Sequence, residues 1–220
     1  TYTLPDYQTQ CGCTDIMMHT MERYFNMSED MELTDGISEA LIKTVMKHSK
    51  ILKEHPDCYE SRAEVMWASS LSHNGLTGCG TDGGDWACHQ LEHEIGGMFD
   101  VAHGAGLAAV WGSWARYVYK ARQERFAKFA RNIFDIQETD DEKAAVAGIE
   151  AMESYYRSVG MPTSLCELGI HATEEQIKEM ADKCSFYGKR TVGVMKKIGA
   201  PEAAEIYRMA NDKSIPLYSR

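Results

Sequence analysis

The sequence predicts an all-α protein, a helical bundle with a short extended segment at its N-terminus. Apolar residues recur at three- and four-residue steps over several long stretches, as they do on the buried face of a helix. No run of alternating β-branched residues supports a sheet, and only residues 1–5 (TYTLP) favour an extended conformation. No repeat or linker-like segment divides the chain, so we expect one helical domain over residues 1–220.

Three helices are expected in the first third of the chain. The first covers residues 10–25, the second about 35–54 and the third 59–73. The second helix repeats apolar residues on one face, and it ends before Pro56 because the residue that precedes a proline avoids the α region. The third is rich in Ala, Met and Trp.

A glycine-rich loop, residues 74–84, separates these helices from the rest. Asp85 follows it and is suited to accept hydrogen bonds from the free N–H groups that begin the next helix. That helix is expected to fray near Gly96 and Gly97. Further along the chain, Thr173 and Gln176 have the spacing of a capping box, which marks the start of another helix. The remaining helices are expected over residues 104–134, 140–159, 173–186 and 201–210.

Composition and charge exclude some classes of function. The chain has 220 residues, 44% of them hydrophobic, and a formal net charge of −10. An acidic protein lacks the clustered Lys and Arg that neutralise phosphates, so we expect no nucleic-acid partner. No apolar stretch approaches the roughly 18 to 20 residues of a membrane span, so we expect no membrane association. The seven cysteines include no C-x-x-C pair, which favours a reduced, cytoplasmic protein.

The histidines point to a metal site. The segment DWACHQLEHEIGGMFDVAHG contains His89, His93 and His103 in a His-x3-His-x9-His array, and Asp15 and His19 form an Asp-x3-His pair far upstream. Residues four apart lie on one face of a helix and can chelate together. A mixture of carboxylate and imidazole accepts Fe(II), Zn(II), Ni(II) or Mn(II), and it suits a catalytic cation rather than a structural zinc.

Spacing alone leaves the ligand set open. His89 and His93 are one turn apart and could bind a cation as a pair. HQLEH, residues 89–93, also matches the H-x-x-E-H signature of zinc metalloproteases, in which Glu92 would be the general base. A third alternative is a helical metal-binding module without catalytic activity. The G-x-G-x-x-G match at residues 78–83 is interpreted as a flexible loop, because no strand precedes it.

The other histidines are interpreted as ordinary core or surface residues, since a lone histidine on a helix seldom binds a metal. Four aromatic residues are also interpreted mainly as core residues. They could line an apolar pocket for a short alkyl chain, although core packing is the commoner role of such residues. The histidines are His48, His55, His73 and His171, and the aromatic residues are Trp67, Trp86, Phe99 and Trp111.

These motifs together resemble one enzyme family. Asp15-x3-His19 followed by His89-x3-His93-x9-His103-Gly104 is similar to the iron-dependent (group III) alcohol dehydrogenases. GGDWACHQLEHEIGGMFDVAHGAGLA resembles the metal segment of the NADPH-dependent butanol dehydrogenase branch. CGCTDIMMHTMERYF and GIEAMESYYRSVGMPTSLCELGI resemble other landmarks of that branch in the same order, so the resemblance covers nearly the whole chain.

The resemblance implies a ligand set. It assigns the cation, Fe²⁺ with Zn²⁺ or Ni²⁺ as alternatives, to Asp15, His19, His89 and His103. It places His93 beside the reacting carbon and the nicotinamide, as a catalytic residue rather than a ligand.

The resemblance also implies a fold, a reaction and partners. The chain corresponds to the C-terminal helical metal-binding domain, and the family's N-terminal nucleotide-binding domain is absent from it. We therefore expect the chain alone to be inactive. The intact enzyme is expected to transfer hydride between NADP(H) and a short-chain aldehyde or alcohol such as butanal or butanol. The family also allows a homodimer.

Overall fold

The computed structural model of the protein describes residues 1–212, so the last eight residues of the predicted domain range 1–220 lie outside the described part. The described residues form nine α-helices and three short 3-10 helices, without a β-strand, which confirms the all-α prediction. The α-helices are α1 (Asp6–Tyr24), α2 (Glu32–Glu54), α3 (Tyr59–His73), α4 (Ala87–Phe99), α5 (His103–Val118), α6 (Gln123–Phe134), α7 (Asp141–Ser158), α8 (Glu174–Cys184) and α9 (Ala200–Asn211). The 3-10 helices are η1 (Leu76–Gly78), η2 (Tyr119–Ala121) and η3 (Cys166–Leu168).

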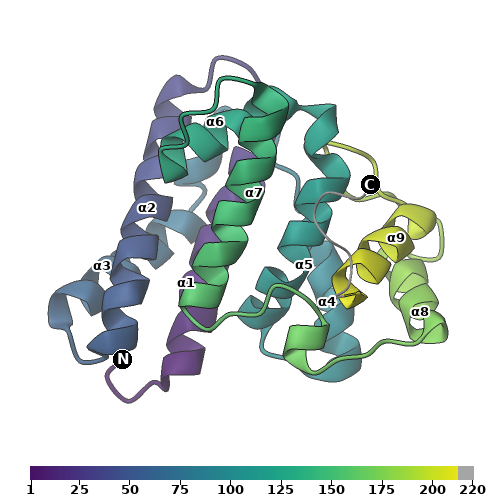
Figure 1. The fold of residues 1–220 in the computed structure, drawn as a ribbon, viewed down its shortest axis with the longest axis horizontal. Helices are drawn as coiled ribbons and strands as arrows, with labels where there is room; N and C mark the ends of the chain where they lie inside the picture. Colours follow the sequence, from purple (N-terminus) through teal and green to yellow (C-terminus); the bar gives the residue numbers. More distant parts are fainter. Residues whose placement is uncertain (213–220) are drawn as a thin grey trace.

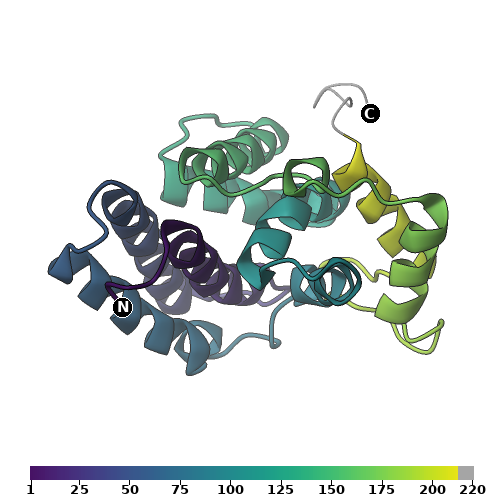
Figure 2. The ribbon, with the colours of Figure 1, turned by 90° about the horizontal axis from the view of Figure 1, so that it is seen from below.

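Two helices, α1 and α5, form the centre of the bundle. The helix α1 packs against α2, α3 and α5, while α5 also packs against α4, α7 and α9. In Figures 1 and 2, α2 and α3 lie on one side of this centre, α8 and α9 lie on the other, and the α6–α7 hairpin covers one face. The sequence segment AGLAAVWGSWA explains why α5 is central, because its small side chains let neighbouring helices approach from every direction.

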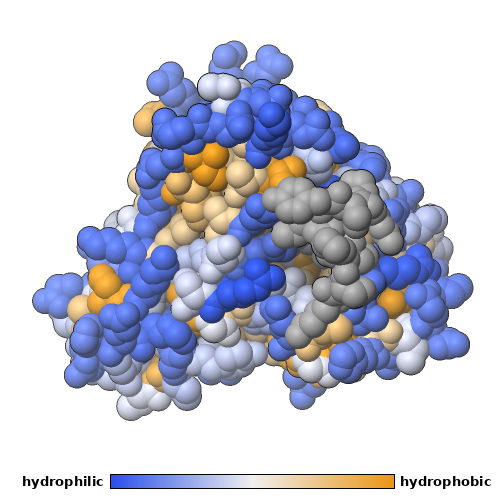
Figure 3. All heavy atoms as spheres, viewed as in Figure 1, coloured by the Kyte–Doolittle hydropathy of each residue, from blue (hydrophilic) through white to orange (hydrophobic). Residues whose placement is uncertain are grey.

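The core is continuous through the bundle and is strongly aromatic at one end. Phe25, which follows α1, stacks on Phe126 of α6 with ring centroids 4.4 Å apart, and Trp114 of α5 meets it edge-on at 5.6 Å. All three side chains are buried. On the face shown in Figure 3, hydrophilic residues cover most of the surface, and hydrophobic ones gather over α6 and the upper part of α7. Among residues 1–212, no helix combines the length and the apolar character that a bilayer crossing requires.

The N-terminal prediction was wrong. Residues 1–5 form a turn, closed by a hydrogen bond from Leu4 N to Thr1 O, rather than an extended segment. The helix α1 then begins at Asp6, four residues earlier than expected, directly after Pro5. The one extended pairing in the described residues is an isolated antiparallel bridge between Val192 and Ile198.

The expected long helix over residues 104–134 is broken into α5 and α6. The chain leaves the α conformation at η2 and at Arg122, whose guanidinium donates to the carbonyl oxygen of Asn26 at 2.6 Å. The break contains neither proline nor glycine, so no local signal marks it. It lets α6 turn back, so that its apolar face packs against α7 and the end of α1.

A buried ion pair holds the end of α1, α2 and α6 together. Arg125 donates from both terminal nitrogens to the Asp35 carboxylate at 2.6 and 2.5 Å, and its Nε donates to the carbonyl oxygen of Tyr24 at 2.7 Å. Lys128 donates to the same carboxylate at 2.6 Å. Asp35 is 3% exposed and Arg125 is 5% exposed. Burial raises the pKa of Asp35, but Arg125 and Lys128 outweigh it and hold that pKa below 3.8.

Gly104 sets the distance between α1 and α5. A Cβ at this position would overlap the carbonyl oxygen of Cys11 and lie 2.8 Å from the Cα of Cys11. The backbones of the two helices therefore meet at a point where only hydrogen fits. This close approach brings His103, the first residue of α5, beside α1.

We expect Gly104→Ala to destabilise the fold by about 1–3 kcal/mol, as overpacking in a rigid core does. It should also weaken metal binding, because α5 must move away from α1 and carry His103 with it. Gly97→Ala is the matched control: this glycine lies in α4 with nothing within 4 Å of an added Cβ, so alanine should stabilise the helix by about 0.5–1 kcal/mol. Urea unfolding measures both, and equal stability of the two variants would contradict the prediction.

Candidate metal centre

Ligand-type side chains converge from α1, α4 and α5. Asp15, His19 and Glu22 lie on one face of α1, because residues four and seven apart share a face of a helix. His89 lies in the first turn of α4, and His103 is the first residue of α5. The helices α4 and α5 are consecutive, whereas α1 lies far upstream in the sequence. The packing of α1 on α5 and of α4 on α5 joins the three.

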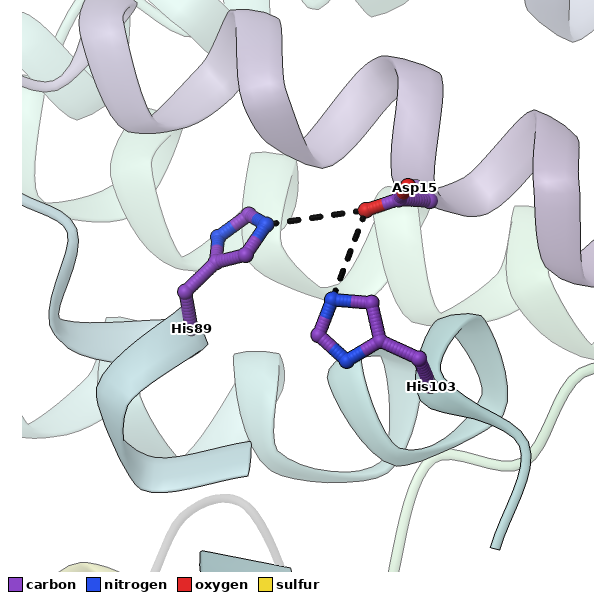
Figure 4. Close-up of side chains that lie close together, drawn as sticks. All are labelled: Asp15, His89 and His103. Atoms are coloured by element: carbon purple, nitrogen blue, oxygen red, sulfur yellow. Dashed lines mark ion pairs between the residues drawn. The ribbon is translucent and has the colours of Figure 1, made fainter. Parts of the chain in front are cut away.

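The nitrogen atoms meet at one carboxylate oxygen. The Oδ1 atom of Asp15 lies 3.5 Å from Nε2 of His89, 3.6 Å from Nε2 of His103 and 3.6 Å from Nε2 of His19. Figure 4 shows the Asp15 carboxylate above the rings of His89 and His103, with both rings turned toward it. The structure thus brings together all four residues that the family resemblance named as ligands.

Two buried carboxylates orient the rings from behind. Glu22, 2% exposed, accepts hydrogen bonds through Oε1 from the backbone N–H of His89 at 2.9 Å and from its Nδ1 at 3.1 Å. Glu92, 1% exposed, accepts a hydrogen bond through Oε2 from Nδ1 of His103. Each ring therefore donates from Nδ1 and directs Nε2 toward Asp15, an arrangement common around histidine ligands of metals. This role of the two glutamates is not predicted from the sequence, although Glu22 is seven residues after Asp15 and shares its helix face.

The donor atoms fit a cation. The Oδ1 atom of Asp15 and Nε2 of His89 are buried and have no hydrogen-bond partner among the described residues. Two such atoms 3.5 Å apart need a positive species between them, either a proton or a metal ion, because buried polar groups are costly when unpaired. Ligands that each lie about 2.1 Å from an ion can be up to about 4.2 Å apart, so each separation from Asp15 Oδ1 is compatible with a cation shared with that histidine. The ligand atoms of Asp15, His89 and His103 also lie within 4.8 Å of one another.

The charges around the site affect the histidines unequally. Burial lowers the pKa of His89, but the neighbouring carboxylates of Asp15 and Glu22 outweigh it and raise that pKa to about 9. Burial lowers the pKa of His19 to about 4, with the neighbouring His89 contributing and Asp15 opposing. The pKa of Asp15 is lowered although burial raises it, because the histidines stabilise its charged form.

His93 lies at the edge of this group, beside His103. Its ring is stacked on His103 with centroids 5.6 Å apart and is 6.3 Å from the ring of His89. The side chain is exposed to solvent, and its partial burial lowers its pKa, while Glu92 opposes this effect and His103 adds to it. The geometry favours a residue that contacts a bound small molecule over one that binds a metal ion together with His89.

Asp85 has more partners than the expected helix cap. Its Oδ1 accepts from the N–H of Ala87, the first residue of α4, and from the indole N–H of Trp114, both at 3.2 Å. Its Oδ2 accepts from the backbone N–H groups of Val194 and Met195 at 2.8 and 2.9 Å. The aspartate therefore fixes the start of the histidine-bearing helix against α5 and against the loop that precedes α9. The helix itself continues through Gly96 and Gly97 to Phe99 instead of fraying there.

The four aromatic residues proposed for an apolar pocket separate in the structure. The ring of Trp86 lies 5.3 Å from that of His89, so it borders the centre. Trp111 is fully buried in the core, Trp67 is 62% exposed, and Phe99 is half-buried at the end of α4. Trp86 is thus the aromatic residue of this set that lines the metal centre.

Comparison with known proteins decides the family. The family model of the Fe-containing alcohol dehydrogenase C-terminal domain matches residues 9–210. The chain belongs to the Fe-containing alcohol dehydrogenase family. Within it, the chain is 37% identical to the NADH-dependent butanol dehydrogenase A of Clostridium acetobutylicum over 94% of its own length and 53% of that protein. It is 31% identical to the NADPH-dependent aldehyde reductase YqhD of Escherichia coli, over 96% of its length and 54% of that protein.

Solved structures of the family agree with this assignment. The crystal structure of the NADH-dependent butanol dehydrogenase A of Thermotoga maritima superposes with a TM-score of 0.90 and 35% identity, covering 96% of this chain and 54% of that one. The cofactor-free aldehyde reductase of E. coli gives a TM-score of 0.89 and 29% identity. The chain spans about half the length of these family members. Their names divide between NADH and NADPH, so the nucleotide stays a prediction.

The metalloprotease alternative is not supported. The family comparison favours a dehydrogenase, and the structure gives the Glu92 carboxylate a different task. The Glu92 side chain is 1% exposed and hydrogen-bonded to His103, so it is not accessible to a water molecule that it could activate. The ring of His93, the second histidine of the H-x-x-E-H pattern, is 6.3 Å from that of His89 and is stacked on His103 instead.

We expect Glu92→Gln to weaken metal binding about 10–100-fold without abolishing it, since loss of an outer carboxylate has effects of that size. The amide keeps the size of the side chain but removes the charge that holds the His103 ring. Titration with Co²⁺ or Zn²⁺ measures the affinity, and Glu94→Gln, at a half-buried position on the same helix, is the control. A protease site predicts an unchanged affinity, and that result would contradict the role assigned here.

Proposed function

We propose that the intact protein is a metal-dependent alcohol dehydrogenase, which transfers hydride between NAD(P)H and a short-chain aldehyde such as butanal. The observation that carries the proposal is the convergence of three imidazole Nε2 atoms on one buried oxygen of Asp15. Names of the family members cited above support the substrate class, since they are butanol dehydrogenases and an aldehyde reductase. The proposal includes a nucleotide-binding domain, which would occupy the half of those proteins that this chain does not match.

Asp15, His19, His89 and His103 would hold the cation, with Fe²⁺ as the proposed native metal. A divalent cation in such a site supplies Lewis acidity, which polarises an aldehyde carbonyl or lowers the pKa of an alcohol. The chain's contribution is to hold four donors in place, with Glu22 and Glu92 fixing two of the rings. Asp85 keeps α4, and therefore His89, in register with α5.

His93 is proposed as the catalytic residue of the chain. Its lowered pKa keeps the imidazole neutral near pH 7, so it can accept the proton of an alcohol during oxidation and return one to the product oxygen during reduction. In reduction, bound NAD(P)H would supply the hydride for the carbonyl carbon and protonated His93 would supply the proton for the oxygen, which balances formation of the alcohol and NAD(P)⁺. The exposed position of His93, beside but outside the ligand group, supports this role.

The seven cysteines support a reducing compartment. All of them lie within residues 1–212, and all are free thiols. Reduced thiols of this number are typical of cytoplasmic proteins. A cytoplasmic location therefore forms part of the proposal.

The test uses the protein together with its nucleotide-binding domain, loaded with Fe²⁺ or Zn²⁺. Oxidation of NADH and of NADPH is followed with butyraldehyde as substrate. We expect turnover in the wild type and a fall in kcat of about 100-fold or more in His93→Ala, with metal content unchanged. Absence of turnover with either nucleotide and either metal would refute the proposal, and a non-enzymatic metal-binding module would then be favoured.

A further inference from the structure

A fifth histidine lies beside the metal centre. From the sequence His73 is expected to be an ordinary core or surface residue, but the C-terminus of α3 brings its ring to within 4.0 Å of the His19 ring, centroid to centroid. Its Nε2 atom lies 3.9 Å from Oδ2 of Asp15. The ligand atoms of Asp15, His19 and His73 all lie within 4.8 Å of one another. His73 therefore adds a nitrogen donor on the solvent side of the same carboxylate.

The orientation of the His73 ring is fixed by its own helix. Nδ1 lies 2.9 Å from the carbonyl oxygen of Ser69 and 2.7 Å from the hydroxyl of Ser72. The Ser72 hydroxyl itself donates to the Ser69 carbonyl at 2.9 Å, so the hydrogen of the ring is on Nδ1. Since a carbonyl oxygen can only accept, the neutral ring presents a lone pair at Nε2. That lone pair faces a carboxylate oxygen, a pairing that is favourable only with a cation between them.

A half-buried guanidinium, that of Arg23, places the end of α3 against α1. Arg23 donates from Nη1 to the carbonyl oxygens of His19 and Ser72, at 3.0 and 2.6 Å. One side chain thus links the backbone of a ligand residue on α1 to the backbone directly before His73. The approach of His73 to His19 is consequently built into the packing and does not depend on a flexible side chain alone.

The two oxygens of Asp15 have different neighbours. Oδ1 faces His89 and His103, while Oδ2 faces His73. A separation of 3.9 Å is within the span of about 4.2 Å that two ligands of one ion can have when each lies about 2.1 Å from it. The side chain of His73 is 41% exposed, so it lies between the centre and solvent.

We propose that His73 is a further metal ligand, which binds the cation through Nε2 together with Asp15 and His19. The proposal rests on the metal centre described under Proposed function and extends its donor set from four protein ligands to five. Zinc in proteins is usually four-coordinate, whereas Fe(II) and Ni(II) accept more ligands. His73 should therefore favour Ni²⁺ and Fe²⁺ over Zn²⁺.

The experiment compares metal binding by the wild-type protein, His73→Ala, His73→Gln and His55→Ala. His55 is an exposed histidine at the end of α2 and is the matched control. Calorimetric titrations with Ni²⁺ and with Zn²⁺ give affinities, and the visible absorption of bound Co²⁺ reports the coordination number. Imidazole ¹⁵N shifts show directly whether Nε2 of His73 binds Zn²⁺.

We expect His73→Ala to weaken Ni²⁺ binding about tenfold or more, to weaken Zn²⁺ binding less, and to change the Co²⁺ spectrum toward lower coordination. His73→Gln should behave like alanine, because an amide can hydrogen-bond to Asp15 but is a poor ligand. Unchanged Ni²⁺ affinity in His73→Ala, or full recovery in His73→Gln, would overturn the proposal. His103→Ala separates the two hypotheses: if it also binds metal normally, the metal centre itself is refuted.

Discussion

Replacing Asp15 with alanine is expected to lower the affinity for a divalent cation by more than about 100-fold. The loss should exceed the 10–100-fold effect of an outer-shell change, because Asp15 is the group on which three histidines converge. Removing it takes away the only carboxylate facing their Nε2 atoms in the part of the chain that the structure describes. Titration of the metal-free protein with Co²⁺ or Zn²⁺ measures the change.

The control for Asp15→Ala is Asp57→Ala, which removes an exposed carboxylate between α2 and α3. Its metal affinity should equal that of the wild type. Circular dichroism of both variants shows whether the helices are retained, so loss of binding can be told apart from loss of folding. An affinity of Asp15→Ala within about threefold of the wild type would show that the cation does not bind where the four predicted ligands meet.

Replacing Asp35 with asparagine is expected to destabilise the protein by about 3–5 kcal/mol. The substitution leaves Arg125, which is 5% exposed, without its charged partner, and removal of one member of a buried ion pair has a cost of this size. The linked contacts to Lys128 and to the end of α1 weaken with it. Urea unfolding should show a lower midpoint with an unchanged slope.

The same ion pair predicts a pH dependence. The pKa of Asp35 is lower in the folded protein than its ordinary value of 3.8. Its contribution to the unfolding free energy is therefore fully present above about pH 4 and is lost as the pH falls through the lowered folded pKa. The difference in stability between wild type and Asp35→Asn should accordingly shrink below pH 4 and stay constant above it.

Glu179→Gln is the control for this prediction. Glu179 pairs with Lys183 on the surface of α8, where both side chains are exposed. Such pairs contribute about 0–1 kcal/mol, so the variant should unfold almost like the wild type. A loss from Asp35→Asn no larger than that from Glu179→Gln would mean that the buried pair does not hold α2 and α6 together.

Local sequence patterns predicted most of the helices correctly. Periodicity and caps placed α2, α3, α7, α8 and α9 within a few residues, and the capping box of Thr173 and Gln176 is present as expected. These features depend on neighbours three or four positions away, which the sequence shows directly. The break between α5 and α6 was not predictable, because its cause is a contact of Arg122 with a carbonyl nearly 100 residues earlier.

The sequence by itself determined the helical class and the resemblance to the family, since these depend on residue types at fixed spacings. That resemblance, rather than spacing alone, named Asp15, His19, His89 and His103 as a group. Only the tertiary structure decided which atoms face one another. In the tertiary structure, Glu22 and Glu92 accept hydrogen bonds from the rings of His89 and His103. His73 lies beside the second carboxylate oxygen of Asp15. The physical reason is that α1, α3, α4 and α5 meet through close packing, and the positions of side chains across such contacts follow from the whole fold rather than from any local segment.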